Sequence, residues 1–151
     1  MDYETYLEQY GTMTHTNVGV SMLPLLRQRR DLFTVRKKGP ERCRRGDVAL
    51  YRRPPNQYVL HRIIAVRDID YVVLGDNCLN KEYGITDADI IGVMTGFTRD
   101  GKEYTVSHPG YRIYSWVWMT FHPVRRLWMR VKNRARRVKQ RLFREKTNKG
   151  E

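Results

Sequence analysis

The stretch YVLHRIIAV, at residues 58–66, decides the fold, because it is rich in the β-branched and aromatic residues that strands favour. Similar short runs lie at 32–36, 47–53, 70–75, 89–99 and 103–106. Turn-forming sequences separate them at 37–40, 52–57, 75–77 and 99–102. Many short strands without long intervening helices predict a mostly β, antiparallel domain. Asp100-Gly101 predicts a two-residue hairpin turn.

Helices are expected at both ends. Asp2 can cap a short helix over 2–10, in which Tyr3, Tyr6, Leu7 and Tyr10 share one face. After Pro123, a basic amphipathic helix is predicted. Its apolar residues recur at spacings of three and four, as Val124, Leu127, Trp128, Val131, Ala135, Val138 and Leu142. The expected organisation is an N-terminal segment at 1–11, a β domain at 12–110, and an aromatic segment with a basic helical tail at 111–151.

The net charge is unevenly distributed. The chain of 151 residues has a formal charge of +13, but residues 124–151 hold twelve basic and two acidic residues, which leaves only +3 for residues 1–123. A hydrophobic content of 40% with ten tyrosines and three tryptophans excludes a disordered chain. A nearly neutral domain therefore carries a strongly basic tail.

The two cysteines, Cys43 and Cys78, exclude a disulfide framework and lack the spacing of metal ligands. They are either free thiols or one bridge, and we expect no metal and no other cofactor. The N-terminus is acidic and polar, unlike a secretory signal. The sequence contains no run of about 18 apolar residues, so we expect no ordinary transmembrane helix. We therefore expect a chain kept in the cytoplasm or on its membrane.

The segment Gly19-Val20-Ser21-Met22-Leu23-Pro24 is the strongest candidate for chemistry. A serine needs a base within hydrogen-bond reach to become a nucleophile, and His61 is the candidate, because a strand at 58–66 turns it away from Leu60 and Arg62. Asp76, in Gly75-Asp76-Asn77, is a candidate to orient the imidazole. Each residue also has a structural interpretation: Ser21 as a turn residue, His61 as a core histidine, and Asp76 as the residue that fixes its own turn.

From Gly19 to about Gly92 the chain resembles the signal peptidase I and LexA-like serine peptidases. It is most similar to the signal peptidase branch found in the endoplasmic reticulum, in archaea and in some spore-forming bacteria. The matching blocks, in the family's order, are Ser21-Met22-x-Pro24, Arg45-Gly46-Asp47-Val48, Leu60-His61-Arg62-Ile63, Leu74-Gly75-Asp76-Asn77 and Ile91-Gly92-Val93.

The resemblance implies which residues carry the reaction. Other members of the clan use a Ser–Lys pair, but this chain has no lysine between Lys38 and Lys81. A Ser–His pair is therefore implied, with Ser21 as nucleophile and His61 as general base. The supporting acid is expected to be Asp76 first. Glu82 is the second candidate, because the branch has a second acidic position, usually an aspartate, six residues after the GDN aspartate. Asp87 and Asp89 are outside candidates, and one of them can simply start the strand at 90–91.

The implied function is a serine endopeptidase that cleaves leader or signal-like peptides through an acyl-enzyme. Its substrate would be an extended strand with small residues next to the cut. Two features depart from the family: Gly19 stands where a serine usually helps to bind the oxyanion, and the membrane-spanning helix of familiar members is missing here. The alternative is a catalytically inactive module of the same clan that binds peptides or nucleic acid.

The basic tail has three interpretations. It can lie on an anionic membrane surface, with Trp116, Trp118, Phe121, Leu127 and Trp128 at the interface. It can bind nucleic acid, although no reader motif accompanies it. It can also be a solvated helix whose apolar stripe packs on its own domain or a partner. We expect the first, which predicts a peripheral protein on the cytoplasmic face of the membrane. A cytoplasmic protein is the alternative.

Overall fold

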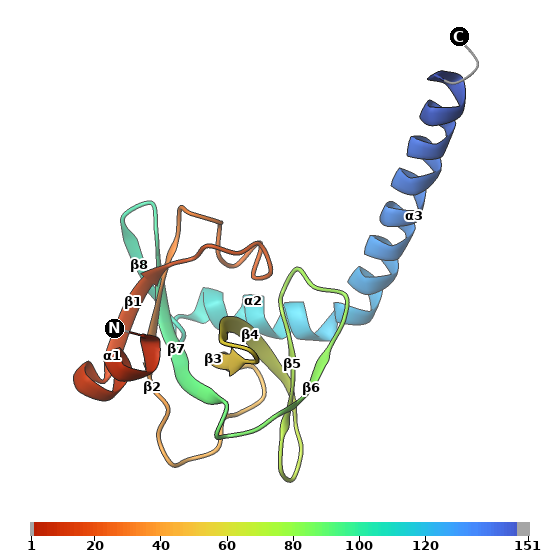
Figure 1. Cartoon of the computed structure of the whole chain (residues 1–151). Helices are drawn as coiled ribbons and strands as arrows, with labels where there is room; N and C mark the ends of the chain where they lie inside the picture. Colours follow the sequence, from red (N-terminus) through yellow and green to blue (C-terminus); the bar gives the residue numbers. More distant parts are fainter. Residues whose placement is uncertain (1, 148–151) are drawn as a thin grey trace. The chain divides into compact units, whose positions relative to one another are not determined.

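The computed structural model describes the backbone of residues 2–147 and the side chains of residues 2–138 and 140. It divides into two compact units, one ending at Met119 and the other beginning at Thr120. The first unit is built on an antiparallel sheet of eight strands with the order β1-β2-β7-β3-β4-β5-β6, and β8 pairs with β7 (Figure 1). The mostly β fold expected from the sequence is therefore confirmed.

Six of the eight strands follow the expected runs closely, whereas β1 and β6 were not expected from the sequence. They are β1 (Thr12–Thr16), β2 (Leu32–Lys37), β3 (Val48–Arg53), β4 (Gln57–Val66), β5 (Tyr71–Leu74), β6 (Glu82–Ile85), β7 (Ile90–Arg99) and β8 (Lys102–Thr105). The β7–β8 hairpin turns at Asp100 and Gly101, whose φ angles are 50° and 77°. Two positive φ angles match the hairpin turn that an Asp-Gly pair favours.

Both faces of the central strands are buried. Along β3, Val48 and Leu50 join one apolar cluster, while Ala49 and Tyr51 join the other. In β4, Leu60 belongs to the first cluster. Because successive side chains of a strand point to opposite faces, Arg62 shares the face of Leu60 and His61 faces the other way.

The helix α1 (Tyr3–Tyr10) is the predicted N-terminal helix, and Asp2 caps it by accepting a hydrogen bond of 2.8 Å from the amide of Thr5. Of the four residues expected on its apolar face, Leu7 is buried, whereas Tyr6 and Tyr10 are 39% and 56% exposed. Helix α1 therefore packs on the sheet through a narrower stripe than the sequence pattern indicated.

The first unit extends beyond residue 110, where the sequence placed the end of the β domain. Helix α2 (Pro109–Thr120) lies across the sheet (Figure 1). The Arg62 guanidinium, on a side chain only 1% exposed, donates hydrogen bonds to both carboxylate oxygens of Asp76, each of 2.8 Å. It also donates to Ser115 Oγ at 2.7 Å and to the hydroxyl of Tyr111 at 3.2 Å. Contacts of the buried ion pair therefore hold α2 in the domain.

The second unit contains α3 (His122–Thr147), the predicted basic helix. Its described apolar side chains are half or more exposed at Val124, Leu127, Trp128, Val131 and Val138. The side chain of Leu142, which completes the predicted stripe, lies outside the described residues. In the part of the chain that the structure describes, no helix has the length and apolar character needed to cross a membrane.

Replacing Arg62 with alanine should lower the free energy of unfolding by about 3–5 kcal/mol, because the Asp76 carboxylate would stay buried without its partner. The matched control is Arg36→Ala, which removes an exposed 3.0 Å pair with Glu41 and should cost less than about 1 kcal/mol. Urea denaturation of both variants measures the difference. Equal losses would contradict the importance of the buried pair.

Candidate active site

Ser21 lies in a loop that follows β1, and the loop is fixed at its base. The Nδ2 atom of the buried Asn17 donates hydrogen bonds to the carbonyl oxygens of Gly19 at 2.9 Å and Leu26 at 3.3 Å. Met22 is 1% exposed and belongs to the first apolar cluster. Because its neighbour is packed in the core, Ser21 has a defined position at the domain surface.

The Gly75-Asp76-Asn77 turn holds the Ser21 loop from the other side. The amide nitrogen of Asn77 donates a 2.7 Å hydrogen bond to the carbonyl oxygen of Ser21. Its side-chain Nδ2 donates a 3.2 Å hydrogen bond to the carbonyl of Val20. The Ser21 side chain is partly exposed, and its hydroxyl makes no hydrogen bond with a described residue.

His61 lies opposite Ala49 in the β3–β4 pair, and its side chain is almost fully buried. Its Nδ1 atom lies 3.1 Å from the hydroxyl of Tyr51 and 3.1 Å from Oε1 of Glu82. The single hydroxyl proton of Tyr51 is donated to Oε2 of Glu82 over 3.0 Å. Both oxygens near Nδ1 can then only accept, so the proton of a neutral imidazole resides on Nδ1 and Nε2 keeps its lone pair.

Gly75 is the point at which Ser21 and His61 meet. A Cβ atom on this residue would lie 2.8 Å from the carbonyl oxygen of Ser21 and 2.9 Å from Nε2 of His61. The Sγ atom of Cys78 would be 2.7 Å from the same position. The main-chain oxygen of Ser21, the imidazole of His61 and a thiol thus surround one glycine, which leaves no room for a larger residue there.

Burial sets the charge state of His61. Removal from water lowers the pKa of the imidazole, while the nearby Glu82 carboxylate raises it and the Arg53 guanidinium lowers it. The net shift is downward from the ordinary value of 6.5, so the ring is neutral near pH 7. Burial also raises the pKa of Tyr51, which keeps its hydroxyl protonated.

The four candidate acids have different partners in the structure. Glu82 is the one in contact with His61. The carboxylate of Asp76, expected first, is bound instead by Arg62 and by the Tyr114 hydroxyl, which donates a 2.8 Å hydrogen bond to Oδ2. The indole nitrogen of Trp118 donates to the main-chain oxygen of Asp76 at 3.0 Å. Asp76 therefore anchors its turn to α2, and its contacts differ from those of an acid that orients His61.

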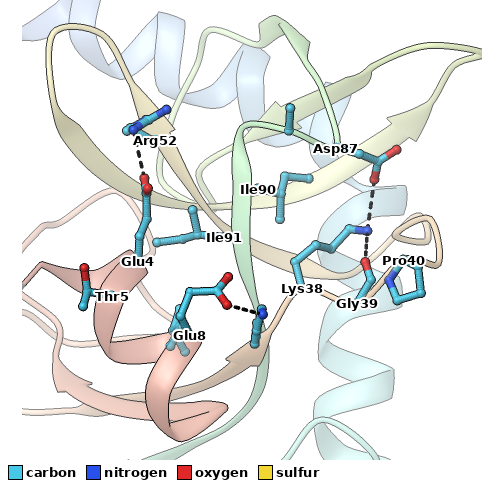
Figure 2. A pocket seen from close by; sticks show the side chains of 13 residues that line it. Glu4, Thr5, Glu8, Lys38, Gly39, Pro40, Arg52, Asp87, Ile90 and Ile91 are labelled. Carbon is cyan, nitrogen blue, oxygen red and sulfur yellow. Dashed lines mark hydrogen bonds and ion pairs between the residues drawn. The ribbon is translucent and has the colours of Figure 1, made fainter.

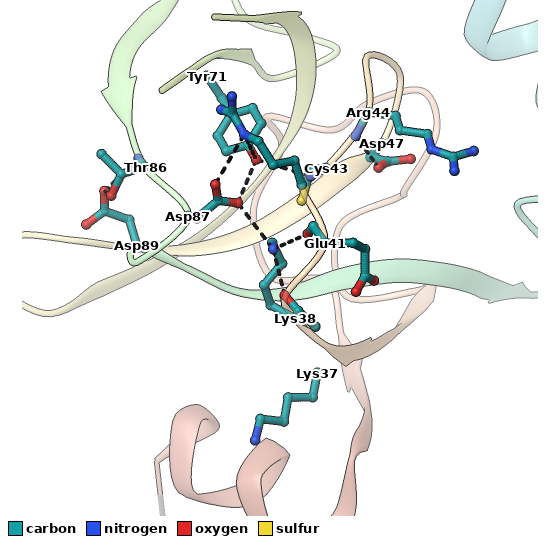
Figure 3. Close-up of polar contacts among 12 residues, drawn as sticks. Lys37, Lys38, Glu41, Cys43, Arg44, Asp47, Tyr71, Thr86, Asp87 and Asp89 are labelled. Atoms are coloured by element: carbon teal, nitrogen blue, oxygen red, sulfur yellow. Dashed lines mark hydrogen bonds and ion pairs between the residues drawn. The ribbon is translucent and has the colours of Figure 1, made fainter. Parts of the chain in front are cut away.

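Asp87 and Asp89 lie between β6 and β7 and are bound by side chains other than His61 (Figure 3). Asp87 accepts a 2.6 Å hydrogen bond from the Tyr71 hydroxyl and pairs with Lys38 at 3.2 Å and Arg42 at 3.3 Å. Asp89 accepts two 2.8 Å hydrogen bonds from Thr86, one from its amide and one from its hydroxyl, directly before β7. Both carboxylates have structural partners, and Lys38 points toward Asp87.

A cavity of about 740 Å³ between α1, the end of β2 and the start of β7 is separate from the Ser21 site (Figure 2). Its wall carries ion pairs between Glu4 and Arg52 at 3.2 Å and between Lys38 and Asp87 at 3.2 Å. Neither Ser21 nor His61 lines it. Its charged side chains are thus already paired with each other.

Neither cysteine forms a disulfide. Cys43 is buried in the second apolar cluster, and its amide donates a 3.1 Å hydrogen bond to the Tyr71 hydroxyl. Cys78 is partly exposed beside Gly75. Within the described residues, no group of three or more His, Cys, Asp or Glu side chains is arranged to hold a metal ion.

The sequence alone did not identify Tyr51 and Arg53, which contact Glu82 beside His61. Tyr51 and Arg53 alternate along β3 with Ala49, so a strand at 47–53 puts all three on one face. The pairing of Ala49 with His61 puts this face of β3 on the same side of the sheet as the histidine, and only the register of β3 and β4 establishes it.

No family model, curated protein or solved structure matches this chain.

Replacing Gly75 with alanine should destabilise the fold by about 1–3 kcal/mol, because the new methyl group would overlap a main-chain oxygen of Ser21. Gly19→Ala is the matched control in the same site. A Cβ there would meet nothing closer than Ser21 Oγ at 3.9 Å, so its effect should stay within about 0.5 kcal/mol. Thermal unfolding distinguishes the two variants, and a neutral Gly75→Ala would show that the Ser21 loop is not packed against this turn.

Proposed function

We propose that the protein is a serine endopeptidase of the signal-peptidase type, which cleaves leader or signal-like peptides. One observation carries the proposal. Nε2 of a neutral His61 and the main-chain oxygen of Ser21 lie against the same glycine, Gly75, and the Glu82 carboxylate lies against Nδ1 on the far side of the ring. This order of serine, imidazole and carboxylate is the arrangement that activates a hydroxyl nucleophile.

The reaction would proceed by acyl transfer. As Nε2 of His61 takes the hydroxyl proton, Ser21 Oγ attacks the peptide carbonyl. The imidazolium then gives this proton to the leaving amine, and the acyl-enzyme is hydrolysed by a water that His61 deprotonates. Glu82 stabilises the imidazolium through Nδ1, and Arg53 compensates the carboxylate's charge. The Ser21 hydroxyl would swing to Nε2 as substrate binds, because catalytic hydrogen bonds often tighten only in the complex.

The substrate would be an extended peptide beside the Ser21 loop. Val18 and Val20 are about half exposed just before Ser21 and offer apolar contacts to a strand laid along this segment. Main-chain N–H groups near Ser21 would bind the oxyanion, because Gly19 has no hydroxyl. Cys78, beside Gly75, would border the space for the residue next to the cut.

Ser21→Ala and His61→Ala should each abolish cleavage of peptides with small residues next to the cut, measured by mass spectrometry. A fluorophosphonate should label Ser21 in the wild type and far more slowly in His61→Ala, because the hydroxyl loses its base. Undiminished cleavage in either variant, or no label on Ser21, would refute the assigned roles and favour a module that only binds peptides.

The pH profile tests the roles of His61 and Glu82. Only the neutral imidazole accepts a proton, so kcat/KM should rise with pH through an apparent pKa below 6.5. Glu82→Gln should move this limb to lower pH, since the carboxylate favours the charged ring, and should also reduce kcat. Glu103→Gln, at an exposed position of β8, is the matched control. An unchanged limb in Glu82→Gln would exclude Glu82 as the supporting acid.

A thiol reagent should inactivate the enzyme through Cys78. Burial raises the pKa of both thiols, that of Cys43 to about 11, but only Cys78 is partly exposed. Alkylation of Cys78 would fill the space beside Ser21, so activity should fall in parallel with modification. Cys78→Ala should keep its activity under the same treatment, whereas Cys43→Ala should remain sensitive. Full activity after complete alkylation of Cys78 would remove this thiol from the substrate site.

A further inference from the structure

Helix α2 has two faces of opposite character. Toward the sheet, Tyr114, Ser115 and Trp118 are buried or half-buried and bind Arg62 and Asp76. On the other side, Ile113 and Trp116 are each 63% exposed, and Val117 is 37% exposed. These three positions follow the i, i+3, i+4 spacing of a single helical stripe. The first unit therefore presents a continuous apolar strip to its surroundings.

An exposed strip with a tryptophan at its centre needs a partner, because large apolar side chains gathered on a surface mark interaction sites. The neighbouring Arg112 is exposed, and no acidic residue occurs in α2. Apolar, aromatic and cationic groups on one helix suit the boundary between the headgroups and acyl chains of an anionic membrane.

The second unit, taken by itself, also exposes apolar, aromatic and basic side chains on one helix. Helix α3 exposes Leu127, Trp128 and Val131 along one stripe, and its exposed basic residues include Arg130, Lys132 and Arg134. Residues 124–151 carry a net charge of +10. Two consecutive helices thus combine apolar stripes with positive charge, which is complementary to a negatively charged lipid surface.

We propose that the outer face of α2, formed by Ile113, Trp116 and Val117, docks on the surface of a bilayer that contains anionic lipid. The three side chains enter the interfacial region, with the Trp116 ring at headgroup level, and the basic residues of α3 supply the electrostatic attraction. The inner face of the same helix binds the turn that holds Ser21, so the docking surface and the candidate site share one element.

The test measures binding of the full-length protein to vesicles of phosphatidylcholine alone and of phosphatidylcholine with phosphatidylglycerol. Cosedimentation and tryptophan fluorescence should show binding to the anionic vesicles, weakened by salt and weak on neutral ones. The double variant Ile113→Ser/Trp116→Ser should bind the anionic vesicles at least about tenfold more weakly. Ile69→Ser is the matched control, because Ile69 is 84% exposed in the turn between β4 and β5 and should not affect binding.

Thermal unfolding should show that both variants keep the fold, since the replaced side chains are exposed. Three results would overturn the proposal: no binding to anionic vesicles, equal binding by the wild type and the double variant, or self-association without lipid that the double variant abolishes. Tighter binding to duplex DNA or RNA than to anionic vesicles, unaffected by the double variant, would identify a nucleic-acid surface instead. Because binding needs no catalysis, these outcomes are independent of the peptidase proposal.

Discussion

The ion pair of Arg62 and Asp76 joins three parts of the chain that are distant in sequence. Both side chains are almost completely removed from water, so each charge depends on the other and on the surrounding hydrogen bonds. Arg62 belongs to β4, Asp76 to the turn after β5, and the hydroxyls that complete the network to α2. Strand, turn and helix must therefore come together for either charge to be tolerated.

This constraint also positions the candidate site. Consecutive residues of β4 point to opposite faces of the sheet, so fixing Arg62 toward α2 directs His61 to the other face, toward Tyr51 and Glu82. The turn that Asp76 anchors carries Gly75, which meets His61, and Asn77, which binds the Ser21 carbonyl. One buried pair thus fixes the strand that carries the proposed base and the turn that binds the loop of the proposed nucleophile.

Helix α2 extends this arrangement to the surface. Its inner side supplies Tyr114 and Trp118 to the Asp76 turn, while its outer side presents Trp116 and Ile113. A helix can serve both purposes because residues three and four apart share a face, so two stripes coexist in twelve residues. Loss of the inner contacts would move the proposed docking surface as well as the turn.

The sequence by itself determined the local structure: the main strands, the Asp2 cap, the Asp100-Gly101 hairpin and the basic helix, since each depends on neighbouring residues. It did not single out β1 or β6, because TMTHT and EYGI are short and only sheet pairing defines them. It selected Ser21 and His61, and in the structure the main-chain oxygen of Ser21 and Nε2 of His61 both lie against Gly75. Only the tertiary structure decided which carboxylate contacts the histidine, because strand register, rather than sequence distance, carries Glu82 to His61 and Asp76 to Arg62.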